Sequence, residues 1–210
     1  MTVAANIYNV PKDDIIRRVE VALLPLRITD GADATTRKNQ RRAAVLMPFL
    51  FRDGEWHIIL TQRPLTMPRH PGQIAFPGGR VEEGERALHA ALRETREEIG
   101  IDPTNVTPLG RLPSFDAMSG FRVTPFVGII CDQAVITPDP REVDDVFDIP
   151  FKFFMNPTNH KPRHVELNNE AFIIYDMPYE GPDGIHRNVW GMTAMMLYRL
   201  WQRGFTHDAY

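Results

Sequence analysis

Three carboxylates and two guanidinium groups are crowded into one short segment of the sequence. Glu94, Glu97 and Glu98 follow one another closely, and Arg93 and Arg96 stand among them. Residues three and four apart are neighbours on a helix, so these like charges repel unless a cation lies between them. One interpretation is a solvated, salt-bridged helix face, although Arg93 and Arg96 are each expected to point away from the centre of the acidic patch. The other is an oxygen-rich site for a hard divalent cation, which suits Mg²⁺ or Mn²⁺ best.

The segment that must position these carboxylates is predicted to be a helix. No helix breaker occurs between Glu85 and Thr95, and a Gly78-Gly79 turn is expected before it. With residues 88–100 on a helix that advances about 100° per residue, one apolar stripe forms and the acidic residues fall on another face. The members of the predicted buried stripe are Leu88, Ala91, Leu92, Thr95 and Ile99.

The spacing around this helix carries a resemblance. Gly79 is followed after five residues by Glu85, and after seven more by the run Arg93-Glu94-Thr95-Arg96-Glu97-Glu98-Ile99-Gly100-Ile101. This pattern resembles the Nudix box, Gly-x5-Glu-x7-Arg-Glu-apolar-x-Glu-Glu-x-Gly-apolar. The one departure is Thr95, where the pattern has an aliphatic residue. Threonine is β-branched and close to valine in size, so it fits this position if its hydroxyl bonds a backbone carbonyl.

The resemblance implies a fold and a chemistry. The fold is an α/β/α sandwich (α+β), in which a mixed β-sheet lies between helices. The chemistry is hydrolysis of a nucleoside diphosphate linked to another group. Glu94 and Glu98, one turn apart, would hold Mg²⁺ or Mn²⁺, and Glu97 would join them through water. The backbone carbonyl of Gly79 is a further metal ligand that the resemblance implies.

Two further roles are expected within the same segment. Arg93 is assigned to orienting the carboxylates, paired with Glu85 as in the family. The general base is a box glutamate or a residue on a later loop, so Glu97 is the first candidate and Glu142 the second.

The loop before the box carries a second resemblance. Residues 60–79 read LTQRPLTMPRHPGQIAFPGG, which is similar to the upstream signature of the coenzyme A pyrophosphatase branch of Nudix hydrolases, Leu-Leu-Thr-x-Arg followed by Arg-x3-Gly-x3-Phe-Pro-Gly-Gly. Ile59 replaces the first leucine, Pro64-Leu65 replaces a Ser-Ala pair, and Arg69 lies one residue closer to Gly72 than in the pattern. Arg63 and Arg69 offer guanidinium forks for phosphate and are the candidate substrate-binding residues.

These resemblances together imply a coenzyme A diphosphatase. Its products would be 3′,5′-ADP and 4′-phosphopantetheine, released by cleavage of the pyrophosphate bond. Two alternatives stay open. Another Nudix activity, on ADP-ribose or other nucleoside diphosphate derivatives, would use the same helix with different loops. A non-catalytic nucleotide or coenzyme A sensor is the third, which the intact Glu94, Glu97 and Glu98 argue against.

Composition narrows the class of protein and its partners. The 210 residues are 43% hydrophobic, which is ample for a core, and the net charge of −3 provides no general attraction to nucleic acid or anionic membranes. The expected partner is therefore a small-molecule substrate, and the sequence leaves open whether two copies form a homodimer. A single cysteine, Cys131, excludes an intramolecular disulfide framework and fits a reducing compartment. No membrane-spanning run or signal-peptide layout is evident, so a cytoplasmic location is expected.

The chain is predicted to divide into an N-terminal helix with a polar linker (1–42) and a Nudix domain (43–210). The N-terminal helix is expected over residues 12–24, with Ile15, Ile16, Val19 and Leu23 inward. Asp53-Gly54 predicts a hairpin turn between strands 43–51 and 56–63. Further elements are expected as strands at 106–113 and 121–131, a strand leaving the sheet at 142–150, a short helix at 151–155, a hairpin of 163–167 and 171–176, and a helix at 190–202.

Overall fold

The computed structural model describes residues 13–26, 40–66, 71–117, 119–167 and 170–206. Its centre is a mixed eight-stranded sheet with the order β3-β2-β1-β7-β5, in which β4 pairs with β1, β6 with β7 and β8 with β2. Only β1 and β7 run parallel; the other pairs in this sheet are antiparallel. The strands are β1 (Arg41–Arg52), β2 (Glu55–Gln62), β3 (Ile74–Ala75), β4 (Gly78–Arg80), β5 (Val106–Arg111), β6 (Phe115–Asp116), β7 (Phe121–Ile130) and β8 (Asp145–Pro150).

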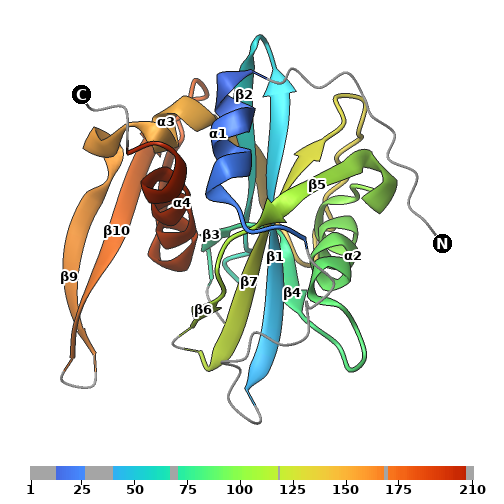
Figure 1. Ribbon diagram of the computed structural model, residues 1–210, viewed down its shortest axis with the longest axis horizontal. Helices are drawn as coiled ribbons and strands as arrows, with labels where there is room; N and C mark the ends of the chain where they lie inside the picture. Colours follow the sequence, from blue (N-terminus) through green and yellow to red (C-terminus); the bar gives the residue numbers. More distant parts are fainter. Residues whose placement is uncertain (1–12, 27–39, 67–70, 118, 168–169, 207–210) are drawn as a thin grey trace.

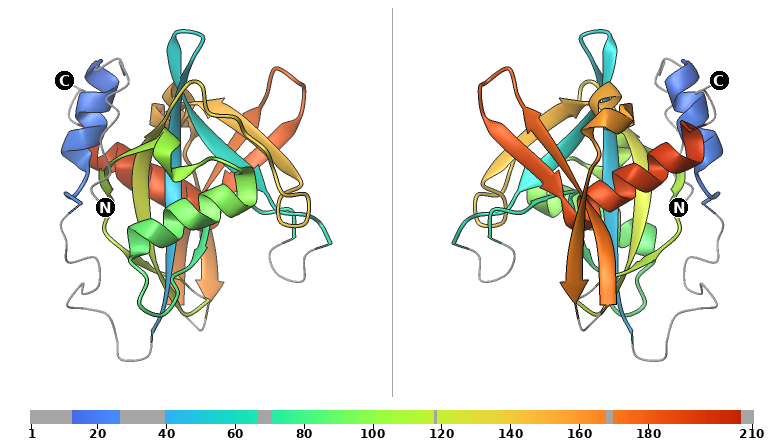
Figure 2. Two further views of the ribbon diagram at one scale, coloured as in Figure 1. Left: turned by 90° about the vertical axis from the view of Figure 1, so that its right-hand side faces the viewer. Right: turned by 90° about the vertical axis from the view of Figure 1, so that its left-hand side faces the viewer.

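Helices cover both faces of this sheet. Figure 2 shows α2 across one face and α4 across the other, with α1 beside α4. The two faces have separate apolar clusters, and β1 contributes to both because its side chains alternate: Leu46 packs with Ala91 of α2, and Phe49 packs on the side of Leu197 in α4. The helices are α1 (Asp14–Ala22), α2 (Ala87–Ile99), α3 (Phe151–Met155) and α4 (Gly191–Gly204), with short 3₁₀ turns at Pro103–Asn105 and Pro157–Asn159. The predicted α/β/α sandwich is confirmed.

The turn between β1 and β2 has the conformation that the sequence predicts. Asp53 and Gly54 both have positive φ, at 51° and 82°, as a two-residue hairpin turn of type I′ requires. Arg52 pairs directly with Glu55 across this turn. This turn sets the register of β1 against β2.

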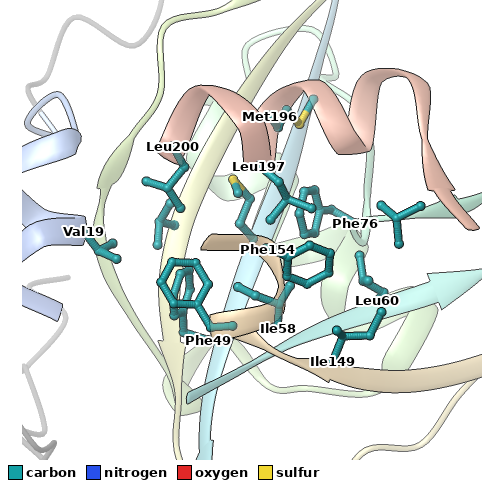
Figure 3. Close-up of a cluster of buried hydrophobic side chains, with 14 of the residues drawn as sticks. Val19, Phe49, Ile58, Leu60, Phe76, Ile149, Phe154, Met196, Leu197 and Leu200 are labelled. Carbon is teal, nitrogen blue, oxygen red and sulfur yellow. The ribbon is translucent and has the colours of Figure 1, made fainter. Parts of the chain in front are cut away.

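The N-terminal helix belongs to the core rather than to a separate arm. The Asp13 side chain caps α1 by accepting a hydrogen bond from the Ile16 amide at 3.1 Å, and its other oxygen accepts one from Trp56 Nε1 at 2.8 Å. Ile16 and Val19 are buried in the cluster that α4 shares (Figure 3). The predicted linker extended to residue 42, whereas β1 already begins at Arg41; residues 27–39 lie outside the described residues.

A second, three-stranded antiparallel sheet lies beside α4, in the order β11-β10-β9 (Figure 1). It contains β9 (Lys161–Leu167), β10 (Glu170–Glu180) and β11 (His186–Trp190). The first two strands form the predicted hairpin, whereas β11 was not predicted. Residues 142–150 were expected to leave the main sheet, but β8 pairs with β2 along its length, because Val146 and Ile149 bury apolar side chains on opposite faces of that sheet.

Helix α4 closes the core on this side. Met196 is buried with Leu197 and Leu200, while Met192 and Met195 are half-buried. Figure 3 shows Leu197 and Leu200 extending from α4 into the apolar cluster that also contains Phe49, Phe76 and Phe154. No helix among the described residues is both long enough and apolar enough to cross a membrane.

Candidate active site

The buried face of helix α2 agrees with the predicted stripe in Ala91, Thr95 and Ile99, and it includes two further small residues, Ala87 and Ala90. Glu98 is buried on the same face. Glu98 is only 5% exposed, so it belongs to the buried face and not to a separate acidic face. Leu88 and Leu92, which were predicted to be buried, are half-buried at the edge of the interface.

Thr95 is fully buried, as expected for an apolar position of the box. Its hydroxyl donates to the backbone carbonyl of Ala91 at 2.7 Å, which satisfies its one polar group inside the core. The helix ends at Gly100, whose φ of 75° is the left-handed conformation that favours glycine, and whose amide bonds the Arg96 carbonyl.

The two glycines before the box form a strand rather than the predicted turn. Gly78 and Gly79 belong to β4 and pair with Val45 and Ala44 of β1. A Cβ atom on Gly79 would lie 2.4 Å from the carboxyl carbon of Glu94, so Glu94 occupies the space that a side chain would need. The Gly78 amide donates to a Glu98 carboxylate oxygen at 3.0 Å. Strand β4 therefore holds both carboxylates against its backbone.

Arg93 is the centre of the acidic cluster, contrary to the expectation that it points away. Its Nε and Nη2 donate to the two oxygens of Glu85 at 3.0 and 3.1 Å, which is the pairing that the family resemblance implies. Its Nη1 donates to Glu94 at 2.8 Å and to Glu97 at 2.9 Å, and Nη2 also bonds the Arg80 carbonyl. The hydrogen bond from Arg93 lowers the pKa of Glu85. One guanidinium thus fixes three carboxylates.

Burial raises the pKa of Glu94 and Glu98, the two glutamates held against β4, whereas the hydrogen bond from Arg93 lowers the pKa of Glu85. Desolvation raises the pKa of Glu94, although its hydrogen bond to Arg93 opposes the rise. Desolvation also raises the pKa of Glu98 to about 8, and the charges of Glu94 and Glu142 add to it. The hydrogen bond from Gly78 and the positive charge of Arg63 act against this rise. Two carboxylates held near each other in a poorly solvated site require positive charge when they ionise.

The donor set fits a hard divalent cation, but the carboxylates are not gathered around one point. Within the described part of the chain, no three acidic, histidine or cysteine side chains lie close enough together to form a ready-made metal cluster. The reason is visible in the hydrogen bonds: Arg93 holds Glu94 and Glu97, and the Gly78 amide holds Glu98. Carboxylate oxygens beside a backbone carbonyl are the ligands that Mg²⁺ and Mn²⁺ prefer. These residues therefore fit Mg²⁺ or Mn²⁺ in chemical type, and Arg93 bonds Glu94 through Oε1 alone, so the second oxygen of that carboxylate could bind the cation.

A loop after β7 adds a fourth carboxylate, which the sequence ranked only second. The amides of Thr137 and Asp139 donate to the carbonyls of Ile99 and Glu98 at 2.8 and 2.9 Å, so the loop satisfies the C-terminal end of α2. Glu142 follows on the same loop, and its charge acts on both Glu94 and Glu98. No local pattern in the sequence indicates that this loop docks on α2, because both bonds use backbone atoms.

The two candidate substrate arginines differ in what the structure shows. Arg63 follows β2, at the neck of a loop closed by two backbone hydrogen bonds: its amide donates to Gln73 and its carbonyl accepts from Gly72. Its charge acts on Glu98, so it lies on the side of the carboxylates. Arg69 lies outside the described residues.

The sequence of this chain is similar to those of known proteins. Residues 40–168 match the family model described as NUDIX domain. The chain is 37% identical over 162 residues to a protein of Pectobacterium atrosepticum named "Uncharacterized Nudix hydrolase NudL", covering 77% of this chain and 81% of that protein. It is 39% identical over 163 residues to the protein of the same name in Salmonella paratyphi B, covering 77% and 82%. Among solved structures, a C. elegans Ap4A hydrolase in a binary complex is 22% identical with a TM-score of 0.47, covering 52% of this chain and 80% of that one.

Proposed function

This chain belongs to the Nudix hydrolase family, and from that premise we propose that it cleaves the pyrophosphate bond of coenzyme A or its derivatives. Hydrolysis of a pyrophosphate-type bond is the general activity of the family. The observation that carries a reaction at this site is the placement of Glu94 and Glu98 against the backbone of Gly78 and Gly79, where burial raises the pKa of both carboxyl groups. A bound divalent cation would stabilise the ionised forms of both carboxylates.

The proposed cation is Mg²⁺ or Mn²⁺, held by Glu94, Glu98 and the carbonyl of Gly79, with Glu97 joining through water. When bound, it would neutralise the charge of the pyrophosphate and lower the pKa of a water molecule. The protein's own part is to fix the carboxylates. Arg93, held by Glu85, keeps Glu94 and Glu97 in place. We assign Arg93 and Glu85 to this orienting role.

The proton of the attacking water requires a general base, and two glutamates are candidates. Glu97 is the first candidate from the sequence, but one oxygen of its carboxylate already accepts a hydrogen bond from Arg93 at 2.9 Å. Glu142 is half-buried on the loop that docks on α2, and its charge acts on Glu94 and Glu98. We therefore propose Glu142 as the general base and keep Glu97 as the alternative.

The substrate assignment rests on the loop between β2 and β3. We propose that Arg63, whose positive charge counteracts the raised pKa of Glu98, binds an oxygen of the pyrophosphate. Coenzyme A also carries a 3′-phosphate, which requires a second cationic partner. Arg69, seven residues before Phe76 in the loop, is the candidate from its position in the sequence.

The test is product analysis after incubation of the protein with coenzyme A and with ADP-ribose, each with Mg²⁺ and with Mn²⁺, and with Glu98→Gln as the control. We expect 3′,5′-ADP and 4′-phosphopantetheine from coenzyme A, and no product from the variant. Cleavage of ADP-ribose alone would support the carboxylate site and contradict the assignment of coenzyme A as the substrate, which rests on the loop between β2 and β3. Binding of coenzyme A without turnover at saturating metal would favour the sensor alternative.

The role of Arg69 has its own measurement. Arg69→Ala should weaken turnover of coenzyme A far more than that of dephospho-coenzyme A, which lacks the 3′-phosphate. An equal loss on both substrates would show that Arg69 does not bind that group.

A further inference from the structure

One buried side-chain hydrogen bond joins α4 to the short strand that ends the substrate loop. Thr193, in the first turn of α4, donates from its hydroxyl to the backbone carbonyl of Ile74 in β3 at 3.1 Å. Ile74 pairs in turn with Gln62, the last residue of β2. Strand β3 contains only two residues, and this bond adds to its pairing with β2 and to the hydrogen bond from the Thr61 hydroxyl to the Ala75 carbonyl.

A second contact reaches β2 from its other edge. Arg187 in β11 has a side chain that is 6% exposed, and its guanidinium donates to Asp145 at 3.1 Å and to Asp183 at 3.0 Å. The same guanidinium lies over the ring of Phe147, 4.3 Å from its centroid. Asp145 is the first residue of β8 and pairs with Gln62. A buried planar fork of this kind holds one geometry, which a lysine would not reproduce.

The two contacts therefore converge on one residue. Gln62 pairs with Ile74 on one edge and with Asp145 on the other, and its carbonyl accepts the Asp144 amide at 2.8 Å. The next residue is Arg63. Arg187 and Thr193 come from adjacent elements, since β11 ends at Trp190 and α4 begins at Gly191, and β11 itself lies against β3.

We propose that the segment from β11 to the first turn of α4 is a positioning element for the substrate, acting through Thr193 and Arg187 on Arg63. This inference rests on the proposed function, in which Arg63 binds a phosphate oxygen of the substrate. In this proposal neither Thr193 nor Arg187 binds the glutamates of α2 or the substrate. They fix β3 and β8, the two strands that flank the end of β2 where Arg63 follows. Displacing a binding group by a fraction of an ångström weakens the contacts that it makes.

The first experiment replaces the Thr193 hydroxyl without changing the volume of the side chain. Thr193→Val removes the donor to Ile74, and Thr193→Ser keeps it. In Thr193→Val we expect backbone hydrogen exchange to accelerate at residues 62–66 and 71–75 but not in α2 (Ala87–Ile99). We expect the KM for coenzyme A to rise about tenfold with a smaller change in kcat. Thr193→Ser should restore both values toward those of the unchanged protein.

The second experiment tests the other contact. Arg187→Lys keeps the positive charge but loses the planar fork that joins Asp145 to Asp183. We expect exchange to accelerate at residues 62–66 and the KM to rise, while exchange in α2 stays unchanged.

The outcomes separate this inference from the proposed function. Hydrogen exchange needs no substrate, so unchanged exchange at residues 62–66 and 71–75 in Thr193→Val overturns the positioning role whatever the enzyme cleaves. Faster exchange in α2 as well as at residues 62–66 in Arg187→Lys overturns it too, because that pattern would show a general loss of stability. If the unchanged protein cleaves ADP-ribose and not coenzyme A, the substrate assignment fails, and the KM shift for ADP-ribose then decides the role of Thr193.

Discussion

Glu94 lies so close to Gly79 that the glycine has no room for a side chain. This contact explains the glycine at the start of the box by space rather than by backbone conformation, since only Gly78 of the pair has a positive φ, at 152°. Arg93 then fixes Glu94 from the other side. The position of one carboxylate is thus set by a missing side chain and by one guanidinium.

Gly79→Ala should therefore displace Glu94 and lower kcat/KM by about a hundredfold, because the new methyl group takes the place of the carboxylate. Steady-state kinetics at saturating Mg²⁺ would measure this. Gly54→Ala, in the hairpin turn far along β1, is the control: a Cβ there meets nothing within 4 Å, but φ is 82°, so stability should fall while activity holds. Equal activity of Gly79→Ala and the unchanged protein would contradict the proposed role of Glu94.

The general base can be identified from a pair of variants. Glu142→Gln should lower kcat by about 10²- to 10⁴-fold at saturating metal, which is the range expected for loss of a general base. Glu97→Gln should lose activity through weaker metal binding and regain part of it as the Mn²⁺ concentration rises. Titrations of kcat against metal concentration for both variants would test this. A loss of kcat in Glu97→Gln that added metal does not restore, with Glu142→Gln still active, would restore the ranking made from the sequence.

At the scale of elements, the sequence pattern of α2 predicts its ends well and its buried face in part. The helix and its end at Gly100 were predicted within a residue, because the box fixes the spacing of its polar residues. The predicted buried face was right for Ala91, Thr95 and Ile99, whereas Leu88 and Leu92 are only half-buried. Ala87, Ala90 and Glu98 are buried in addition. Close packing of alanines then buried Glu98, and no propensity predicts a buried glutamate.

Other elements were missed for definite reasons. Strand β4 begins with Gly78-Gly79, which is typical of a turn and becomes a strand only because β1 pairs with it. Strand β11 is five residues long, and its alternation places Arg187 at a buried position. The pairing of Arg93 with Glu85 could be expected from the family resemblance, whereas the docking of the Glu142 loop on α2 uses backbone groups and leaves no trace in side-chain patterns.

Thr95 gives a prediction about the helix itself. The Ala91 carbonyl that accepts its hydroxyl is also the partner of the Thr95 amide in the regular helix, so removing the hydroxyl leaves no polar group unsatisfied. Thr95→Val should then change the free energy of unfolding by less than about 1 kcal/mol. Urea unfolding in the absence of metal would measure it. A much larger loss would mean that the hydroxyl has another partner.

For the molecule as a whole, His160 predicts a pH dependence of stability. It is buried beside Tyr175, Tyr198 and Trp201, where β9, β10 and α4 meet, and its Nε2 lies 2.6 Å from the Phe154 carbonyl. Burial lowers its pKa below the usual value of 6.5, so the unfolded chain binds the proton more readily than the folded one.

The His160 contribution to stability is therefore complete above about pH 6.5 and is lost as the pH falls through the lower pKa of the folded state. Urea midpoints measured between pH 5 and pH 8 would test this, with His160→Gln as the comparison. The variant should lose part of the decline on the acidic side. An identical decline in both proteins would place the responsible proton elsewhere.

The contact between the first and last helices has a consequence for how the chain is made. Arg203 near the end of α4 donates to the Ala22 carbonyl at the end of α1 at 2.6 Å, and both helices cover the same face of the main sheet. A ribosome releases α1 and the carboxylate helix long before it releases α4. The nascent chain must therefore wait with Phe49, Ile58 and Leu60 uncovered until the last helix emerges, whereas the face under α2 can close early. A chaperone that shields apolar strands during translation would therefore bind the face of the main sheet that α1 and α4 later cover.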